Sequence, residues 1–225
     1  MNMFDIKTDS LSTRERLIIK TAELLMRESF GTVSVDDICK ATDIKKGTFY
    51  HHFASKTDLA IAAYDWKWEY FKKILDHCFD NALPPAQQLE RYADEAYKLQ
   101  KRIHDLEGKV YGCPHANAGQ EMGAQDDRIR QKIADIFDKN GAYLADFLVR
   151  LPAYADQPFE KRMVRAQEMF SYTMGILYQA KIMNDPEVIR RDLLVGLKRL
   201  VGVEENSTSW DNKKAGCGGI GSAAA

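Results

Sequence analysis

The sequence predicts an all-α fold. Serine residues that precede an acidic residue by three positions recur before amphipathic stretches, and this pairing marks helix starts. Glycine and proline separate the stretches, and no run of alternating polar and apolar residues indicates a strand. The 225 residues are 45% hydrophobic, which suffices for one large domain or for a small domain joined to a larger one.

The first helix is expected to begin after Ser12. Glu15 follows three positions later, so the two side chains can form a capping box that satisfies the first backbone amides. We expect Gly31 to end this helix, because glycine is the usual residue after a helix C-terminus. The apolar residues between these ends recur at helical spacing and form a buried stripe: Leu17, Ile18, Ala22, Leu24 and Leu25.

Three more helices follow closely. Ser34 begins a short second helix, the sequence "ATDI" makes a tight turn, and a third short helix is expected over about 45–52. Ser55 caps a long fourth helix that reaches about Asn81, before two consecutive prolines. The remaining sequence predicts two longer amphipathic helices, 86–107 and 126–150, with a short helix, 115–122, in a glycine-rich segment between them. A final pair of helices is expected over 158–183 and 187–202.

The composition excludes several classes of protein. There are 32 Lys and Arg residues against 33 Asp and Glu, a formal net charge of −1, so the chain is not a globally basic nucleic-acid binder. No apolar run approaches the ~18 residues that span a bilayer, and the first residues do not resemble a secretory signal. The four cysteines are widely spaced, which argues against disulfides and for a reducing cytoplasm.

One stretch departs from this neutral average. The sequence "IKKGTFYHHFASK", residues 44–56, has three lysines, two histidines and three aromatic residues but no acid. Three short helices with a tight turn between the second and third form a helix-turn-helix, whose third helix enters the major groove of DNA. Lysines there can reach phosphates, hydroxyl groups can donate to phosphate oxygens, and a glycine allows close backbone approach: Lys45, Lys46, Gly47, Thr48, Tyr50 and Lys56.

These residues also carry a family resemblance. The sequence "TVSVDDICKATDIKKGTFYHHFASKTDLA" resembles the N-terminal DNA-binding domain of TetR/AcrR-type transcriptional regulators, and the similarity covers about residues 12–62. The resemblance implies that Thr48, Tyr50 and Lys56 position the phosphates. It implies that four residues face the bases: Lys46, Gly47, His51 and His52. Ser34 is implied to cap a helix start that meets a phosphate, while Phe49 and Phe53 are expected in the small core.

We therefore expect four segments. Residues 1–11 form a flexible N-terminus, 12–56 the helix-turn-helix DNA-binding domain, and 57–203 an effector-binding and dimerisation domain. Residues 204–225 form a disordered tail, because a sequence rich in Gly, Ser and Ala cannot bury a core.

The resemblance implies a homodimer that binds a palindromic operator in double-stranded DNA. The last two helices offer a heptad-like seam for a four-helix bundle between two subunits. The same stripe is also compatible with packing inside one chain. The expected interface residues are Met163, Phe170, Leu177, Leu193, Leu197 and Leu200.

The middle helices are expected to enclose a pocket for a small-molecule effector. Aromatic and soft side chains are the candidates for its walls, although most such residues in any protein serve packing: Trp66, Tyr70, Tyr92, Cys113, Met122, Phe137 and Tyr172. No cofactor is expected.

The segment "YGCPHANAGQEM", residues 111–122, is similar to one found in a branch of these regulators in which some members sense electrophiles or oxidants through a cysteine. Cys113 precedes a predicted helix start, where thiolate is favoured, and His115 or Lys109 could lower its pKa further. Two readings stay open: a reactive thiol whose modification releases DNA, and a buried cysteine that shapes a turn.

Other functions fit less well. The cysteines and histidines lack the spacing of a metal site, and no orienting group or oxyanion loop accompanies Cys113 as an enzyme nucleophile. The sequence favours a ligand-responsive repressor, not an enzyme. The alternative is a thiol-based redox or electrophile sensor, or a small-molecule-binding protein, that acts chiefly through Cys113.

Overall fold

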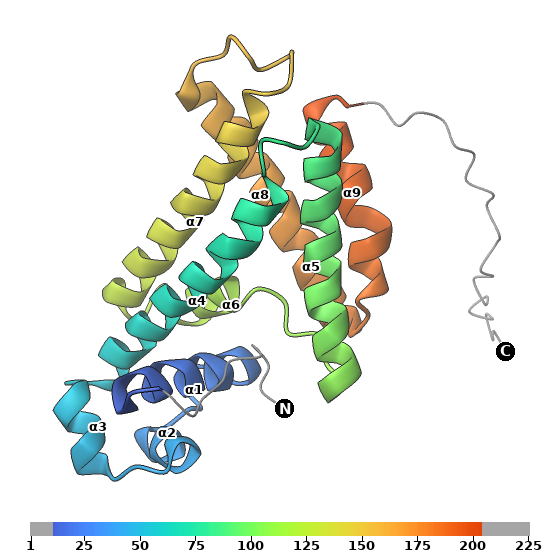
Figure 1. Cartoon of the computed structure of the whole chain (residues 1–225). Coiled ribbons are helices and arrows are strands. Elements are labelled where there is room, and N and C mark those ends of the chain that lie inside the picture. Colours follow the sequence, from blue (N-terminus) through green and yellow to red (C-terminus); the bar gives the residue numbers. More distant parts are fainter. Residues whose placement is uncertain (1–10, 204–225) are drawn as a thin grey trace, which may run out of the picture.

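The computed structural model describes residues 11–203, and the regular structure in that range is entirely helical (Figure 1). The predictions for residues 1–10 and for the tail, 204–225, lie outside the described residues. The helices are α1 (Thr13–Arg27), α2 (Val35–Thr42), α3 (Lys46–His52), α4 (Lys56–Cys78), α5 (Pro85–Glu107), α6 (Pro114–Met122), α7 (Asp127–Leu148), α8 (Phe159–Met183) and α9 (Glu187–Val201). The predicted all-α fold is confirmed.

Side-chain caps set the helix starts that the sequence predicts. Ser12, Ser34 and Ser55 each accept a hydrogen bond from the backbone N–H three residues on, which satisfies an amide that has no partner inside the helix. Two helices end in the left-handed conformation without glycine: α2 at Asp43 (φ 53°) and α8 at Asn184 (φ 50°). Asp and Asn tolerate this conformation better than most residues.

Two predicted helix ends are wrong. Helix α1 ends at Arg27, because Glu28 turns extended (φ −128°), and Gly31 lies in the following loop rather than at the helix end. Helix α4 ends at Cys78, three residues before the predicted Asn81. The loop after α1 is held by side chains from α4 and α6, and the sequence near Gly31 carries no sign of these distant contacts.

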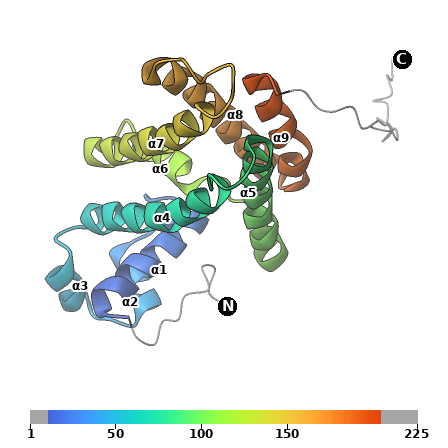
Figure 2. The same ribbon diagram turned by 45° about the horizontal axis from the view of Figure 1, so that its top comes forward.

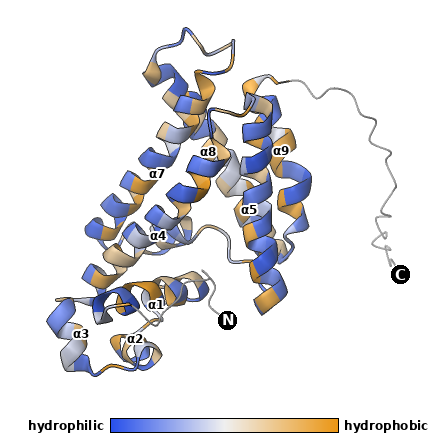
Figure 3. Ribbon diagram, in the orientation of Figure 1, coloured by the Kyte–Doolittle hydropathy of each residue, from blue (hydrophilic) through white to orange (hydrophobic). Residues whose placement is uncertain are grey.

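The helices form a small N-terminal unit and a larger bundle joined by α4. Figure 1 shows α1, α2 and α3 together at one end, with α4 running from them alongside α7. Helices α5 and α9 lie side by side, and α8 packs against both α7 and α9 (Figure 2). Each helix carries both hydrophilic and hydrophobic residues along its length (Figure 3), as expected where one face is buried and the other is exposed.

One continuous cluster of buried side chains extends through both parts. Leu17, Ile38, Phe49 and Leu59 are fully buried and bring α1 to α4 together. In the larger bundle, fully buried residues come from α5, α7, α8 and α9: Leu89, Ile129, Ile136, Leu144, Leu148, Met169, Leu193 and Leu197. Because buried apolar area is the main source of stability, these groups fix the positions of α3 at one end and α6 in the middle.

Candidate DNA-binding surface and effector pocket

Helices α2 and α3 are joined by a turn that backbone hydrogen bonds close tightly. Ile44 N–H donates to the Cys39 carbonyl at 3.0 Å, and Asp43 in the left-handed conformation reverses the chain. Helix α3 then packs through Phe49, which is fully buried, and Phe53 follows it into the core. The predicted core roles of these two aromatic residues are confirmed.

The opposite side of α3 faces outward. The structure exposes most of the predicted DNA-contacting residues, namely Ser34, Lys45, Lys46, Gly47, Thr48, Tyr50 and His51, and leaves His52 and Lys56 half-buried. Tyr50 is 56% exposed, which is unusual for a large ring directly beside a fully buried one. Exposed aromatic and cationic side chains on one short helix match the requirements of a groove-facing surface.

The start of α3 is electrostatically unusual. Its N-cap, Lys45, makes no side-chain capping bond, and its first turn has no acidic residue, although helix N-termini normally favour negative charge. Lys46 Nζ lies 2.9 Å from Asp36 Oδ1, and this carboxylate raises the pKa of Lys46. Both side chains of that pair are more than half exposed, so the pair holds Lys46 only weakly.

Lys56 has a different environment from the one its expected phosphate role suggests. Its Nζ donates to the backbone carbonyls of Phe30 and Val33, at 2.8 and 2.9 Å. The same ammonium lies 4.1 Å from the centre of the Phe30 ring. Lys56 therefore holds the α1–α2 loop against the start of α4, in addition to any contact with DNA.

The α1–α2 loop is also held by α6. The Glu121 carboxylate accepts hydrogen bonds from the backbone N–H of Phe30, at 2.8 Å, and of Gly31, at 2.7 Å. These bonds are the part of the structure that ties α6 directly to the loop before α2. A charged acceptor with two amide donors makes a strong and directional contact.

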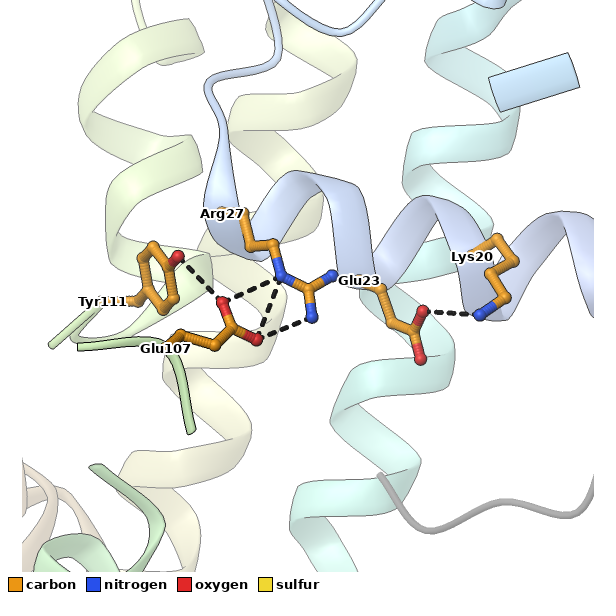
Figure 4. A network of polar contacts seen from close by, with 5 residues as sticks. All are labelled: Lys20, Glu23, Arg27, Glu107 and Tyr111. Carbon is orange, nitrogen blue, oxygen red and sulfur yellow. Dashed lines mark hydrogen bonds and ion pairs between the residues drawn. The ribbon is translucent and has the colours of Figure 1, made fainter. Parts of the chain in front are cut away.

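A second connection joins the end of α1 to the end of α5 (Figure 4). The Arg27 guanidinium donates through Nε and Nη2 to the Glu107 carboxylate, with a shortest distance of 2.7 Å, and Tyr111 Oη donates to the same carboxylate at 2.9 Å. Arg27 and Tyr111 both hold the pKa of Glu107 below its usual range, Arg27 more strongly. Lys20 and Glu23 form a separate pair on α1.

The segment between α5 and α6 is fastened on both sides. Gln100 donates to the Gly112 carbonyl and accepts from the Gly112 N–H, at 3.1 and 3.0 Å. Asn184 accepts from Val110 N–H and donates to the Gly108 carbonyl, each at 2.9 Å. Gly112 has φ 71°, which only glycine adopts without strain. This segment therefore delivers Cys113 to a fixed position.

Cys113 borders a cavity of about 90 Å³ between α4, α5, α6, α7 and α8. Four of the predicted ligand residues line this cavity: Tyr70, Tyr92, Cys113 and Phe137. The other three do not. Trp66 stacks on Tyr70, Met122 is buried in the core, and Tyr172 donates to the Asp192 carbonyl beside Gly196.

Sequence reasoning missed the cation in this cavity. Lys67 lines it and is only 7% exposed. Burial lowers the pKa of Lys67 to about 7, while Cys113 raises it. The available signal was its position: Lys67 continues the stripe of buried residues on α4 that includes Ala60, Ala63, Tyr64 and Leu75. A lysine in an apolar stripe is uncommon unless its charge is used.

The two groups expected to activate Cys113 do not do so. His115 is buried with its Nε2 3.3 Å from the Tyr64 carbonyl, and burial lowers its pKa to about 4, so it is uncharged at neutral pH. Lys109 lines a separate outer cleft of about 680 Å³. Burial raises the pKa of the Cys113 thiol, although the N–H groups of Ala116 and His115 and the charge of Lys67 oppose this. The resting form is a thiol.

The predicted dimer residues are placed largely inside the chain. Leu193 and Leu197 are fully buried, and Phe170 and Leu177 are 8% and 9% exposed. These four side chains are covered within the single chain, and their role at a subunit interface stays a prediction. Met163 and Leu200 are half-buried. The spacing of three and four residues is the same for any packed helix face, so it could not show which partner covers it.

The outward face of α8 has its own apolar stripe. Val164, Tyr178 and Ile182 are 58%, 50% and 67% exposed, and Met183 is 57% exposed. Gly175 lies among them, with nothing within 4 Å of the position that a side chain would occupy. By contrast, a side chain at Gly196 would meet the Tyr172 ring at 2.1 Å, so Gly196 serves packing between α8 and α9.

Within residues 11–203, no cluster of His, Cys, Asp or Glu is arranged to hold a metal ion. In the same part of the chain, no helix combines the length and the hydropathy that crossing a membrane requires.

Comparison with known proteins points to one family. The sequence model for bacterial regulatory proteins of the tetR family matches residues 17–63. The transcriptional regulator AcuR of Cereibacter sphaeroides is 33% identical over 131 residues, and the match spans 58% of each chain. An uncharacterized HTH-type transcriptional regulator of Lactococcus lactis is 25% identical over 181 residues, which span 79% of this chain and 88% of that one.

Solved structures match the fold of this protein over a longer part of the chain. A regulatory protein TetR from Rhodobacter sphaeroides superposes with a TM-score of 0.69 at 27% identity, over 84% of this chain and 97% of that one. The reduced form of E. coli NemR gives a TM-score of 0.68 at 18% identity, over the same shares. At that lower identity the likeness concerns the fold.

Proposed function

Because the chain is a transcriptional regulator of the TetR/AcrR type, we propose that it is a homodimeric repressor of a palindromic operator and leaves the DNA when a small molecule occupies the pocket beside Cys113. This family consists of transcriptional regulators and not of enzymes. The activity that we propose for this chain is the binding and release of DNA in the cytoplasm.

The observation that carries this proposal is the linkage of the loop before α2 to the pocket through α6. Helix α6 begins at the cavity, where Cys113 is its N-cap, and near its other end Glu121 holds the loop before α2. Helix α4 supplies a parallel path, from Lys56 at the loop to Lys67 at the cavity. A ligand that displaces the start of α6 or the middle of α4 therefore acts on the elements that hold the helix-turn-helix.

The energetic requirement is modest. A ligand changes the equilibrium between two arrangements only through a difference in affinity for them, and about 1.4 kcal/mol corresponds to a tenfold effect. In the proposed mechanism, the empty cavity accompanies the spacing of the two α3 helices that fits the operator. The filled cavity favours a different spacing.

The proposed subunit interface uses the outward faces of α8 and α9. The exposed stripe of Val164, Tyr178 and Ile182, with the open Gly175 between them, supports this choice. A partner helix can approach closely at a glycine, and the surrounding apolar side chains would be removed from water. Two-fold symmetry then matches a palindromic site.

A second candidate function is sensing of electrophiles by Cys113. The cysteine stands at a helix N-terminus near Lys67, which is an arrangement that stabilises a thiolate once it forms. The raised pKa of Cys113 favours a noncovalent effector as the first candidate.

Binding to a randomised pool of DNA, by selection and sequencing, tests the function. We expect a palindromic motif from the full-length protein at fixed salt. Alkylation of the thiols before selection, repeated with Cys113→Ser, separates the two candidates. A motif lost on alkylation in the wild type but kept in Cys113→Ser supports sensing by Cys113, whereas a motif that survives alkylation supports a noncovalent effector. Failure to select any motif would refute the repressor.

A further inference from the structure

The cavity beside Cys113 combines apolar walls with one buried cation. Phe71, Leu75, Phe137 and Phe170 contribute to the walls, and Lys67 reaches the cavity from α4. Apolar walls alone would suit a neutral hydrocarbon. A buried ammonium is costly in such surroundings, so its presence at the wall gives the site a preference for an anion.

Two acidic groups of this region form ion pairs with lysines. Glu23 of α1 lies 2.9 Å from Lys20 Nζ, and Glu95 of α5, which also lines the cavity, lies 3.2 Å from Lys98 Nζ. Burial and Arg27 of α1 lower the pKa of Lys67, whereas Cys113 and Glu23 raise it. A carboxylate ligand would add a charged acceptor within reach of the Lys67 ammonium, alongside the contacts that this group makes in the protein.

Glu95, which is paired with Lys98, is a second charged residue in the lining of the cavity. Four other groups there are neutral at physiological pH. His115 of α6 has a pKa of about 4, and burial raises the pKa of Cys113. Burial also raises the pKa of Cys78 of α4 and of Tyr92 of α5, each to about 12. Lys67 is thus the group at the cavity whose charge changes near pH 7.

The size of the cavity limits the ligand. Its volume is about 90 Å³, whereas pockets for drug-sized molecules have roughly 300–1,000 Å³ and an apolar cavity of about 150 Å³ takes up benzene. The space is smaller than that benzene-binding cavity, so it limits the ligand to a few non-hydrogen atoms. Inorganic phosphate is a poor match, because its remaining oxygens would face aromatic and aliphatic side chains without hydrogen-bond partners.

We propose that this cavity binds a small organic monocarboxylate, with the carboxylate on Lys67 and the hydrocarbon part against Phe71, Phe137 and Phe170. The assignment rests on the proposed function only in placing the effector in this cavity. Lys67 is then the residue that determines specificity, because it distinguishes an acid from the amide or alcohol of the same shape.

Butyrate, butyramide and 1-butanol are probes of matched size. We expect butyrate to raise the melting temperature of the full-length protein and to bind measurably by isothermal titration calorimetry, while the two neutral analogues bind at least tenfold more weakly. Lys67→Met should remove that preference. Lys72→Met, on the exposed part of the same helix where Lys72 pairs with Asp76, is the matched control and should bind butyrate as the wild type does.

Proton uptake gives a second readout that a merely structural role of Lys67 would not produce. A bound carboxylate raises the pKa of Lys67 above its value of about 7 in the empty protein. Binding at pH 8 should therefore take up a large fraction of one proton, and binding at pH 6 almost none. Calorimetry in two buffers of different ionisation enthalpy measures this number, and Lys67→Met should abolish it.

The outcomes separate the ligand class from the regulatory proposal. Equal binding of butyrate and butyramide, absence of butyrate binding, or an unchanged preference in Lys67→Met would overturn the carboxylate assignment. Binding of butyrate without any loss of operator affinity would keep the assignment and refute release by this pocket. Release of the operator by alkylation or by a neutral compound, with no carboxylate binding, would overturn the ligand class and leave the repressor intact.

Discussion

Gly47 is an exposed glycine inside a seven-residue helix, where glycine normally weakens the helix. Nothing in the described structure lies within 4 Å of the position that a side chain would take. The fold therefore does not require glycine at this position. A requirement from outside the chain, such as close approach of DNA backbone to α3, is the physical reason that our proposal supplies.

Gly47→Ala should consequently separate stability from binding. We expect the free energy of unfolding to rise by about 0.5–1 kcal/mol, because alanine loses less backbone entropy in a helix. Operator affinity should fall roughly tenfold, about 1.4 kcal/mol. Thermal denaturation and fluorescence anisotropy with the selected operator measure the two effects. Unchanged affinity would place Gly47 away from the DNA.

Lys56→Met should lower stability as well as DNA affinity. The substitution removes a charged donor from the carbonyls of Phe30 and Val33, and we expect a loss of roughly 1–3 kcal/mol in the free energy of unfolding. The exposed Lys45→Met is the matched control, with an expected change within about 0.5 kcal/mol. Equal urea denaturation curves for the two variants would exclude a structural role for Lys56.

At the scale of helices, the sequence predicts most boundaries because their causes are local. The caps at Ser12, Ser34 and Ser55 lie within three residues of their partners, and the predicted starts and ends of α5 to α9 lie within two residues of those observed. The end of α1 was not predictable. The loop that follows it is held by Lys56 and Glu121, which lie far along the chain.

The contact between α1 and α5 should make stability depend on pH. Arg27 lowers the pKa of Glu107 in the folded protein, so the unfolded chain binds this proton more readily. The stabilisation is complete above the unfolded pKa of about 4.3 and is lost as pH falls through the lower folded pKa. We expect wild type to exceed Glu107→Gln by roughly 1 kcal/mol at pH 7, and this difference to shrink towards pH 3.

Urea denaturation at pH 7, 5, 4 and 3 measures the difference. Glu28→Gln, in the same region, serves as the control for a general effect of removing a carboxylate. A difference between wild type and Glu107→Gln that stays constant down to pH 3 would contradict the role assigned to the Arg27 contact.

Glu121 should control the opening of the α1–α2 loop. Each oxygen of the Glu121 carboxylate accepts a hydrogen bond from one backbone N–H of the loop. Gln has one oxygen and one NH2 group, so in Glu121→Gln one of the two loop N–H groups loses its acceptor. We expect the amides of Phe30 and Gly31 to exchange with solvent at least tenfold faster, about 1.4 kcal/mol. Hydrogen exchange measured by mass spectrometry tests this, with Gln120→Ala as control. Protection that is the same in Glu121→Gln would break the proposed link between α6 and α2.

At the scale of the molecule, the sequence predicts which helix faces are buried more readily than it predicts what covers each of them. The 3-and-4 spacing of Leu193 and Leu197 correctly indicates burial, but the cover comes from the same chain. Likewise, the aromatic residues Tyr92 and Phe137 were identified as pocket candidates, whereas Lys67 was not. The apolar stripe of α4 indicates that Lys67 is buried, but which cavity the side chain reaches depends on how five helices meet, and no local pattern encodes that.

The exposed stripe on α8 should hold the dimer together. Ile182→Glu places a charge on a surface that is 67% exposed in the single chain, so the fold should be retained while the subunits separate. Analytical ultracentrifugation should show a dimer for wild type and for Leu106→Glu, an exposed apolar position on α5, but a monomer for Ile182→Glu. A dimer in all three would move the interface away from this stripe.

The bonds of Asn184 to Gly108 and Val110 also bear on the order in which the chain folds. They join residues 76 and 74 positions apart, and the entropy lost in closing a loop grows with its length. Local helices can therefore form before the turn next to Cys113 is fastened. A newly synthesised chain therefore passes through a period in which this thiol is more accessible than in the folded protein, where it is half-buried. The length of that period depends on the folding rate and not on the equilibrium structure.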